Sequence, residues 1–169
     1  MNADDLRVIQ APLKEWYRAD PKAALITLRA SGALDSAAIA CKVETGKALA
    51  VAGLHPATGG TGADLCSGDM LLEALVACAG VTLKAVATSM GVMLRSGRVT
   101  AEGDLDFRGT LGVDKQAKVG FADIRLKFDL DADAPPDQLD TLLKLTERYC
   151  VVLQTLKASP KIEVKLARG

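Results

Sequence analysis

The chain of 169 residues has little of what marks proteins that bind nucleic acids. Aromatic residues make up only 4% of it, and 21 Lys and Arg balance 21 Asp and Glu, so the formal net charge is zero. A neutral protein has no overall attraction for a phosphate backbone, and few rings are left to stack on bases. We therefore expect no nucleic acid among its partners.

Signals for a membrane or for export are also missing from the sequence. No stretch approaches 18 uninterrupted apolar residues, and the first ten residues, MNADDLRVIQ, carry acids where a signal peptide carries bases. These absences predict a cytoplasmic protein with no membrane partner.

Cysteine and histidine are too few and too scattered for a metal centre. The chain has one histidine, His55, and its four cysteines lie 25, 12 and 72 residues apart: Cys41, Cys66, Cys78 and Cys150. This spacing is neither a dense disulfide framework nor a CxxC metal site. The glycine-rich segment 59–68 lacks the lysine and hydroxyl residue that end a phosphate-binding loop. We expect neither a metal nor an organic cofactor.

The composition that remains is typical of one globular domain. Hydrophobic residues make up 49% of the chain and charged residues 25%, close to the average of folded proteins. We divide the chain into an N-terminal arm at 1–22 and a domain at 23–169. In the arm, a helix is predicted at 13–18 between Pro12 and Pro21, neither of which belongs inside a helix.

Hydrophobic periodicity predicts the elements of the domain, since period two is typical of strands and a period near 3.6 of helices. In chain order they are two or three strands within 23–52, a loop at 55–68, a helix at 69–90, an antiparallel pair of strands at 99–107 and 124–130, a helix at 136–157, and a closing strand at 161–166. The helix at 69–90 is apolar nearly all round and is predicted to be buried. This order makes the fold class α+β.

Cys78 and Cys150 each lie in the middle of a predicted helix, on its most apolar stripe. If these stripes pack together, the two sulfurs can form a redox pair; in the simpler interpretation both residues are small core hydrophobes. Cys66 competes for the role of nucleophile, because free amides at a helix start lower the pKa of a nearby thiol. A third interpretation, a Cys/His hydrolase, has to use His55.

Two segments of the sequence resemble one family. Residues 67–91, SGDMLLEALVACAGVTLKAVATSMG, and the later segment ERYCVVLQTL are similar to the OsmC/Ohr family of osmotically inducible and organic hydroperoxide resistance proteins. The order of elements from residue 23 to residue 167 is similar as well. The resemblance implies an OsmC-like fold, with antiparallel sheets around a long central helix that carries Cys78 and a second helix that carries Cys150. It also implies an intertwined homodimer with sites at the subunit interface.

The resemblance assigns roles to particular residues. It makes Cys78 the peroxidatic cysteine and Cys150 the resolving one, and it places an acid at Asp69, nine residues before Cys78. Nine residues turn a helix by about 900°, so Asp69 faces away from its own Cys78 and could serve the partner's site; it is equally suited to cap the helix. Family members also use an arginine from the N-terminal strands. Arg29 is the candidate here, followed by Arg18.

The function that the resemblance implies is reduction of organic hydroperoxides. The Cys78 thiolate becomes a sulfenic acid and then a disulfide with Cys150, which an external dithiol reduces. An apolar site raises a thiol pKa, so this mechanism requires a nearby cation such as Arg29. The alternative is a non-enzymatic dimer of the same fold that binds a small apolar ligand or senses redox state. Two departures from the family are Asp69 in place of a glutamate, and Val151 where proline often follows the second cysteine.

Overall fold

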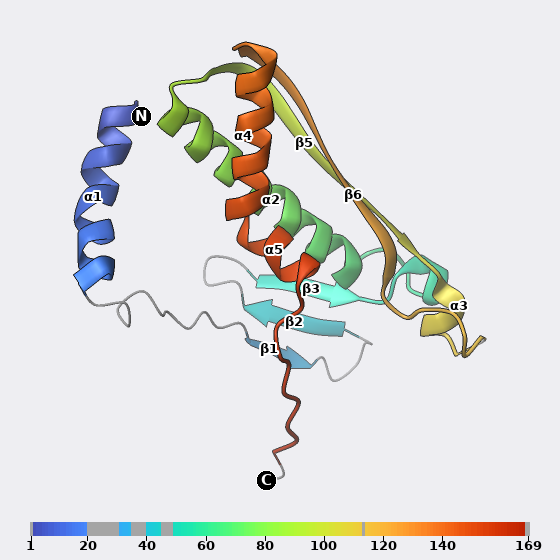
Figure 1. Ribbon diagram of the computed structural model, residues 1–169. Helices are drawn as coiled ribbons and strands as arrows, with labels where there is room; N and C mark the ends of the chain where they lie inside the picture. The colour runs from blue at the N-terminus through green and yellow to red at the C-terminus, as the bar shows by residue number, and fades with distance from the viewer. Residues whose placement is uncertain (1, 20–30, 35–39, 45–48, 113, 168–169) are drawn as a thin grey trace.

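The computed structural model describes residues 2–19, 31–34, 40–44, 49–112 and 114–167, which form an α+β fold. At its centre is the long helix α2 (Ser67–Met90), which contacts a two-stranded hairpin and the helices α4 (Pro136–Tyr149) and α5 (Val151–Lys157). Figure 1 shows α4 crossing in front of α2, with the hairpin to the right of the helices and the sheet of β1, β2 and β3 below them. The predicted fold class is confirmed.

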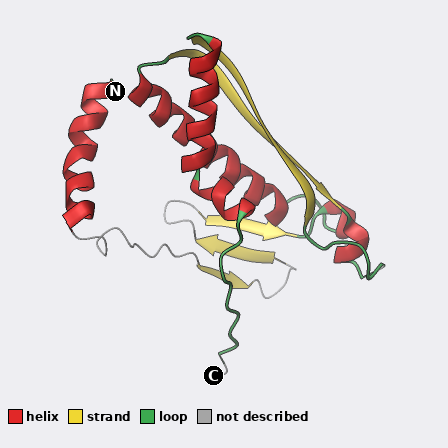
Figure 2. Cartoon of the chain, in the orientation of Figure 1, coloured by secondary structure: helices red, strands yellow, loops and turns green. Residues whose placement is uncertain are grey.

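The four-stranded sheet is built mostly from the N-terminal part of the domain. Its strands β1 (Ser31–Leu34), β2 (Ala40–Glu44) and β3 (Leu49–Gly53) are antiparallel, and the short β4 (Leu65–Cys66) pairs in parallel with β3. This confirms the strands predicted within 23–52. Between β3 and β4 lies the 3-10 helix η2 (Pro56–Thr58), and β4 leads directly into α2 (Figure 2).

Helix α2 begins two residues earlier than predicted, with Cys66 as its N-cap, and ends at Met90. Gly91 follows with φ of 69°, a left-handed conformation that ends helices and favours glycine. Its buried residues are spaced four apart and form one stripe: Leu75, Ala79, Leu83 and Ala87.

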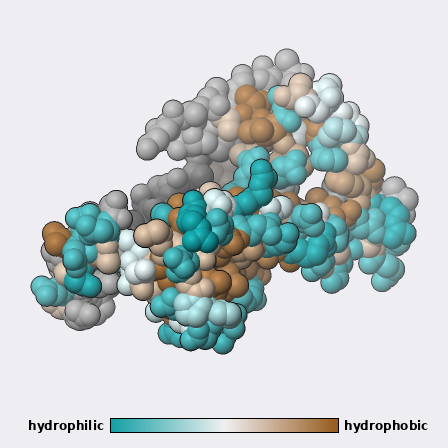
Figure 3. Space-filling view, turned by 90° about the horizontal axis from the view of Figure 1, so that it is seen from above, coloured by the Kyte–Doolittle hydropathy of each residue, from teal (hydrophilic) through white to brown (hydrophobic). Residues whose placement is uncertain are grey.

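The prediction that α2 is buried nearly all round is wrong for the single chain. Val81 is 73% exposed and Leu71 is 38% exposed. The hairpin and the C-terminal helices pack against α2, and among the other described segments α1 makes a smaller contact with it. Apolar surface shown in brown interrupts the teal polar surface in the central part of Figure 3.

The apolar character of α2 also bears on the membrane. Among the described residues, it is the one helix long and apolar enough to span a bilayer by length and composition, and 22% of its most apolar 18-residue stretch is buried. The core helix of a globular fold meets the same criteria, and α2 packs as such a helix, so this is weak evidence for a membrane segment.

The predicted antiparallel pair is confirmed as a long hairpin of β5 (Met93–Leu105) and β6 (Phe121–Asp133). Its register places Val99 opposite Phe128 and Ala101 opposite Leu126, and these four residues pack toward α2. The other face is charged, and Arg125 there bonds to Asp104 and Asp123. These ion pairs are exposed, so each contributes little to stability.

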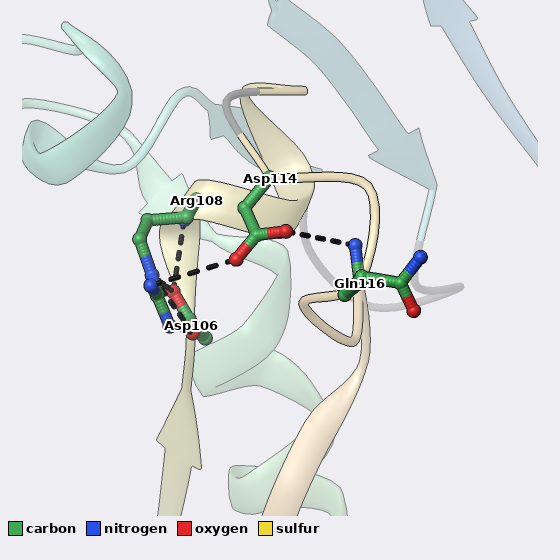
Figure 4. A network of polar contacts seen from close by, with 4 residues as sticks. All are labelled: Asp106, Arg108, Asp114 and Gln116. Carbon is green, nitrogen blue, oxygen red and sulfur yellow. Dashed lines mark hydrogen bonds and ion pairs between the residues drawn. The ribbon is translucent and has the colours of Figure 1, made fainter.

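A polar network holds the connection at the far end of the hairpin (Figure 4). Asp106 caps the short helix α3 (Phe107–Thr110) by accepting a hydrogen bond from the Arg108 amide at 3.0 Å. The side chain of Arg108 also bonds to Asp106, and this contact lowers the pKa of that carboxyl. Asp114 accepts from the Gln116 amide at 2.9 Å and lies 3.6 Å from the Arg108 guanidinium. Arg108 thus joins the beginning and the end of the turn.

The single helix predicted at 136–157 is wrong, because the chain leaves the helical conformation at Cys150. This residue is extended, with φ of −73° and ψ of 106°, and it separates α4 from α5. Its carbonyl accepts the first bond within α5, from the Gln154 amide at 2.9 Å. The three amides before Gln154 therefore have no acceptor inside their own helix.

The closing strand predicted at 161–166 is also wrong for the single chain. Residues 158–167 form no strand, and the three apolar side chains of the segment are exposed, at 76% for Ile162, 93% for Val164 and 80% for Leu166. The alternation of apolar and charged residues suits a strand, but no sheet edge of the described chain pairs with it.

The N-terminal helix is longer than predicted and passes through Pro12. Helix α1 spans Ala3–Ala19, although an internal proline costs a helix about 3 kcal/mol. Its start is fixed by a reciprocal pair: the Asn2 amide donates to Asp5 at 3.0 Å, and the Asp5 amide donates to the Asn2 side chain at 2.8 Å. The sequence analysis overlooked this capping signal.

Candidate active site

The structure brings Cys78 and Cys150 together. Cys78 lies in the middle of α2 and is partly buried, whereas Cys150 lies at the junction of α4 and α5 and has no exposed surface. Both belong to one apolar cluster that includes Leu75 and Ala79. The two sulfurs are hydrogen-bonded to each other. The predicted position of Cys150 inside a helix is therefore wrong, but the predicted proximity of the two residues agrees with the structure.

The break at Cys150 directs backbone amides at the sulfur of Cys78. The amides of Val151 and Val152, at the start of α5, donate hydrogen bonds to it. The hydroxyl of Thr82, one turn further along α2, is a further donor. The valine that replaces the family's proline is therefore chemically useful here, because proline has no N–H to donate.

These contacts separate the pKa values of the two thiols. Burial is the largest influence on Cys78 and raises its pKa, but the hydrogen bonds from Val152, Cys150, Val151 and Thr82 together lower that pKa below its ordinary value. Burial raises the pKa of Cys150, and the neighbouring Cys78 raises it further. Cys78 is therefore the thiol that ionises first, and Cys150 stays protonated and donates to it.

Among the described residues, each contact that lowers the pKa of Cys78 is a hydrogen bond. Arg29 lies outside the described residues. Arg18 belongs to α1, and the position of its side chain is likewise outside what is described.

Asp69 does not join the thiol pair of its own chain. It is the third residue of α2, so the alternative prediction that it caps the helix is wrong; Cys66 holds the cap position. Nine residues separate Asp69 from Cys78, roughly 13.5 Å along the helix axis. Asp69 instead lines a pocket of about 330 Å³ that also has His55 and Cys66 in its wall.

The pocket at the start of α2 gives little support to a Cys/His hydrolase. The Nδ1 atom of His55 accepts a hydrogen bond from the Ala57 amide at 3.0 Å, and the imidazole stacks on Phe107 with ring centres 4.8 Å apart. Nε2 therefore carries the proton of the neutral ring, and the lone pair that a base needs is already used. Cys66 lines the pocket, while the side chain of Cys41 lies outside the described residues.

Two contributors to the site were missed by the sequence analysis. Thr82 lies four residues after Cys78, a spacing that places two side chains on the same face of a helix, so the pattern could have revealed it. The amides of Val151 and Val152 gave no such signal, because the helix break that frees them was not predicted. Within the part of the chain that the structure describes, no cluster of three His, Cys, Asp or Glu side chains is able to hold a metal.

A central helix and a broken second helix bring two thiols together beside a long hairpin in an α+β fold. The family model of the OsmC-like proteins matches residues 60–165. The chain therefore belongs to the OsmC-like family, which confirms the resemblance noted in its sequence.

Solved structures agree with this assignment at the level of the fold. An OsmC-like protein from Mycoplasma pneumoniae is 13% identical, with a TM-score of 0.65 over 79% of this chain and 89% of that one. An organic hydroperoxide resistance protein OsmC from Legionella pneumophila is 16% identical, with a TM-score of 0.55 over 79% and 91% of the two chains. For the organic hydroperoxide resistance protein OhrB of Bacillus subtilis, the values are 15%, 0.52, 79% and 93%. Comparison with curated protein sequences gave no match.

Proposed function

We propose that this chain reduces organic hydroperoxides through Cys78 and Cys150. The observation that carries the proposal is the contact between the two sulfurs, in which the pKa of Cys78 is lowered and the pKa of Cys150 is raised. The family includes organic hydroperoxide resistance proteins. The geometry supports the same division of roles, since a nucleophile must be ionised and its partner must remain close to react with the product.

In the proposed reaction, the Cys78 thiolate attacks the outer oxygen of the hydroperoxide. The O–O bond breaks, the alkoxide leaves and takes a proton as the alcohol, and Cys78 becomes a sulfenic acid. The sulfur of Cys150 then attacks the sulfur of Cys78, a disulfide forms, and water leaves. An external dithiol reduces the disulfide and returns both thiols.

A homodimer is the second part of the proposal. The exposed face of α2 and the uncovered apolar side chains at 162, 164 and 166 support it, because soluble monomers rarely expose contiguous apolar surface of this kind. In such a dimer, Asp69 and Arg29 are proposed to complete the site of the partner or of the same chain. A cytoplasmic location, with no nucleic acid or membrane as partner, remains our expectation.

Thiol counting tests the proposed reaction. Fully reduced protein is titrated with cumene hydroperoxide, and free thiols are counted after removal of the oxidant. We expect the loss of two thiols per chain in the wild type and in the control Cys66→Ser. Cys78→Ser should lose none at a comparable rate, and Cys150→Ser should lose one and hold a sulfenic acid. Unchanged thiols in the wild type would instead favour the non-enzymatic alternative, a dimer of the same fold that binds a small apolar ligand or senses redox state.

A further inference from the structure

The backbone carbonyl of Glu147, in the last turn of α4, has an unusual partner. In a continuous helix this carbonyl accepts a hydrogen bond from the amide four residues later, which is that of Val151. The Val151 amide instead donates to the sulfur of Cys78. The side chain of Gln154 takes its place, since the Nε2 atom of Gln154 donates to the Glu147 carbonyl at 2.7 Å. Gln154 therefore satisfies an acceptor that the helix break deprives of its usual donor.

Other contacts also join the two sides of the break. The Gln154 amide donates to the Cys150 carbonyl at 2.9 Å, and the Cys150 amide donates to the Thr146 carbonyl at 3.0 Å. Lys157 lies 3.1 Å from the carboxylate of Glu147, but both side chains are about half exposed, so this ion pair contributes little. Of the two side-chain links between α4 and α5, the one from Gln154 reaches the backbone at which the helix breaks.

The contact made by Gln154 is possible only while the helix is broken. Seven residues of a continuous helix rise roughly 10.5 Å, which is farther than a glutamine side chain reaches. In a continuous helix, the amides of Val151 and Val152 would bond to carbonyls of α4 and would no longer point at Cys78. The bond from Gln154 is therefore present in the arrangement that supplies donors to the sulfur and lost in the other.

The surroundings of Cys78 make these donors important. The described residues that pack in its cluster are apolar apart from Cys150, the one other titratable group among them. An apolar environment disfavours a charged sulfur unless hydrogen bonds compensate for the lost water. Of the four donors to the sulfur named above, two are amides at the break. A residue that stabilises the break therefore acts on both of them.

We infer that Gln154 is a positioning residue for Cys78, because its bond to the Glu147 carbonyl stabilises the break from which two amides point at the sulfur. The inference rests on the proposed function, in which ionised Cys78 is the nucleophile. Gln154 acts through the backbone and takes no part in the bonds that form and break. Its effect on the sulfur is measurable without a peroxide, as reactivity toward an alkylating agent.

Gln154→Met tests this role, because methionine is similar to glutamine in length and helix propensity but donates no hydrogen bond. Thr155→Val is the matched control. It also removes one exposed hydrogen bond of α5, from the Thr155 hydroxyl to the Val151 carbonyl at 2.9 Å, but this bond does not cross the break.

Iodoacetamide labels each protein over a series of pH values, and mass spectrometry of the peptides measures Cys78 separately from the other cysteines. Below the midpoint of the pH profile, we expect the rate at Cys78 to fall about two- to threefold in Gln154→Met, which corresponds to one weak hydrogen bond. The rate in Thr155→Val should equal that of the wild type. An unchanged profile in Gln154→Met overturns the inference, as does a lower urea midpoint without a change in the profile, which would indicate a purely structural role.

A double variant distinguishes positioning of the amides from a separate influence of Gln154 on the sulfur. Proline at position 151 has no amide to return to α4, and it disfavours a continuous helix. In a Val151→Pro background, Gln154→Met should therefore slow alkylation of Cys78 less than it does in the parent chain. Equal effects in both backgrounds would show that Gln154 acts independently of the break, contrary to the inference.

Reduction of cumene hydroperoxide separates failure of this inference from failure of the proposed function. If the wild type reduces the peroxide and Gln154→Met is slower by the same factor as in alkylation, both are supported. If the wild type reduces no peroxide but alkylation slows as expected, the positioning role stands and the proposed function fails. If peroxide is reduced and Gln154→Met changes neither rate, the inference alone is overturned.

Discussion

Cys66 lies at the start of helix α2, and Cys78, in the middle of α2, lies beside the start of helix α5. Of these two thiols, only Cys78 accepts hydrogen bonds from the amides of a helix start. Cys66 is the residue on which α2 begins, yet its side chain accepts no hydrogen bond from the amides of that helix. Cys78 lies three turns further along, where α2 offers it no free amide, and it accepts from Val151 and Val152 at the start of α5. A helix start therefore activates the thiol at which its amides point, rather than the thiol nearest to it in sequence.

The largest difference between Cys66 and Cys78 is expected when each sulfur is removed in turn. Cys78→Ser is expected to abolish hydroperoxide reduction, because a serine hydroxyl is not ionised at neutral pH. Cys66→Ser should retain the rate of the wild type. The rate of peroxide consumption in the presence of excess dithiol measures both, and an inactive Cys66→Ser protein that folds normally would reverse the assignment of roles.

The packing that holds α5 against Cys78 is the next target. Leu75 has no exposed surface and packs in the same cluster as Cys150, so Leu75→Ala is expected to lower the free energy of unfolding by about 2–5 kcal/mol. Leu71→Ala, at a position 38% exposed on the same helix, should cost less than about 1 kcal/mol. Urea unfolding of both variants measures the difference, and equal losses would show that the thiol cluster is not the core of the fold.

A proline at position 151, where the family often has one, tests the contribution of a single amide donor to Cys78. Val151→Pro removes one amide from the sulfur of Cys78 while keeping a residue suited to the first position of a helix. Cys150 is already extended, as the residue before a proline prefers. A hydrogen bond to a charged group is lost, so we expect the pKa of Cys78 to rise.

The pH dependence of thiol alkylation in a Cys66→Ser background measures this change. A lowered pKa means that the thiolate is already present at a pH where an ordinary thiol is protonated. As the pH is raised, the alkylation rate of the parent protein therefore begins to increase at a lower pH than that of an ordinary thiol. Val151→Pro moves the midpoint upward. Val151→Ala keeps the N–H and should leave the midpoint in place; a shift in the alanine variant would attribute the effect to the side chain instead.

The smallest effect is expected at Thr82, whose hydroxyl is the weakest of the named donors to Cys78. Thr82→Val removes the hydroxyl at nearly constant shape and should raise the pKa of Cys78 by less than Val151→Pro does. Thr82→Ser keeps the donor and should match the wild type in the same alkylation experiment. A larger effect of Thr82→Val than of Val151→Pro would mean that α2, rather than α5, controls the thiol.

Local patterns in the sequence predicted most of the fold. The alternation in β5 and β6 and the repeat of apolar residues in α2 are local, and both elements are present as predicted. Errors arose where a distant contact decides the outcome. The segment YCVV has no glycine or proline to end a helix, and the break at Cys150 is accompanied by donation of its freed amides to a sulfur on another element.

The site was predictable in its sulfurs but not in its donors. The resemblance pointed to Cys78 and Cys150 because the side chains themselves are recognisable in sequence. Backbone amides carry no such mark, since every residue except proline has one. The free amides predicted at the start of α2 therefore made Cys66 a competing candidate for the nucleophile. In the structure, the amides that reach a sulfur are those of Val151 and Val152, and that sulfur belongs to Cys78.

The bare C-terminal segment has a consequence for how this protein behaves on dilution. Its three apolar side chains, at 162, 164 and 166, are exposed, and they contribute to stability only when another surface buries them. If a second copy supplies that surface, folding is bimolecular, and the melting temperature rises with protein concentration. A chain diluted below the dissociation constant of the dimer would then present to solvent an unpaired segment whose alternating pattern suits a strand, the kind of segment through which proteins aggregate and at which proteases cut.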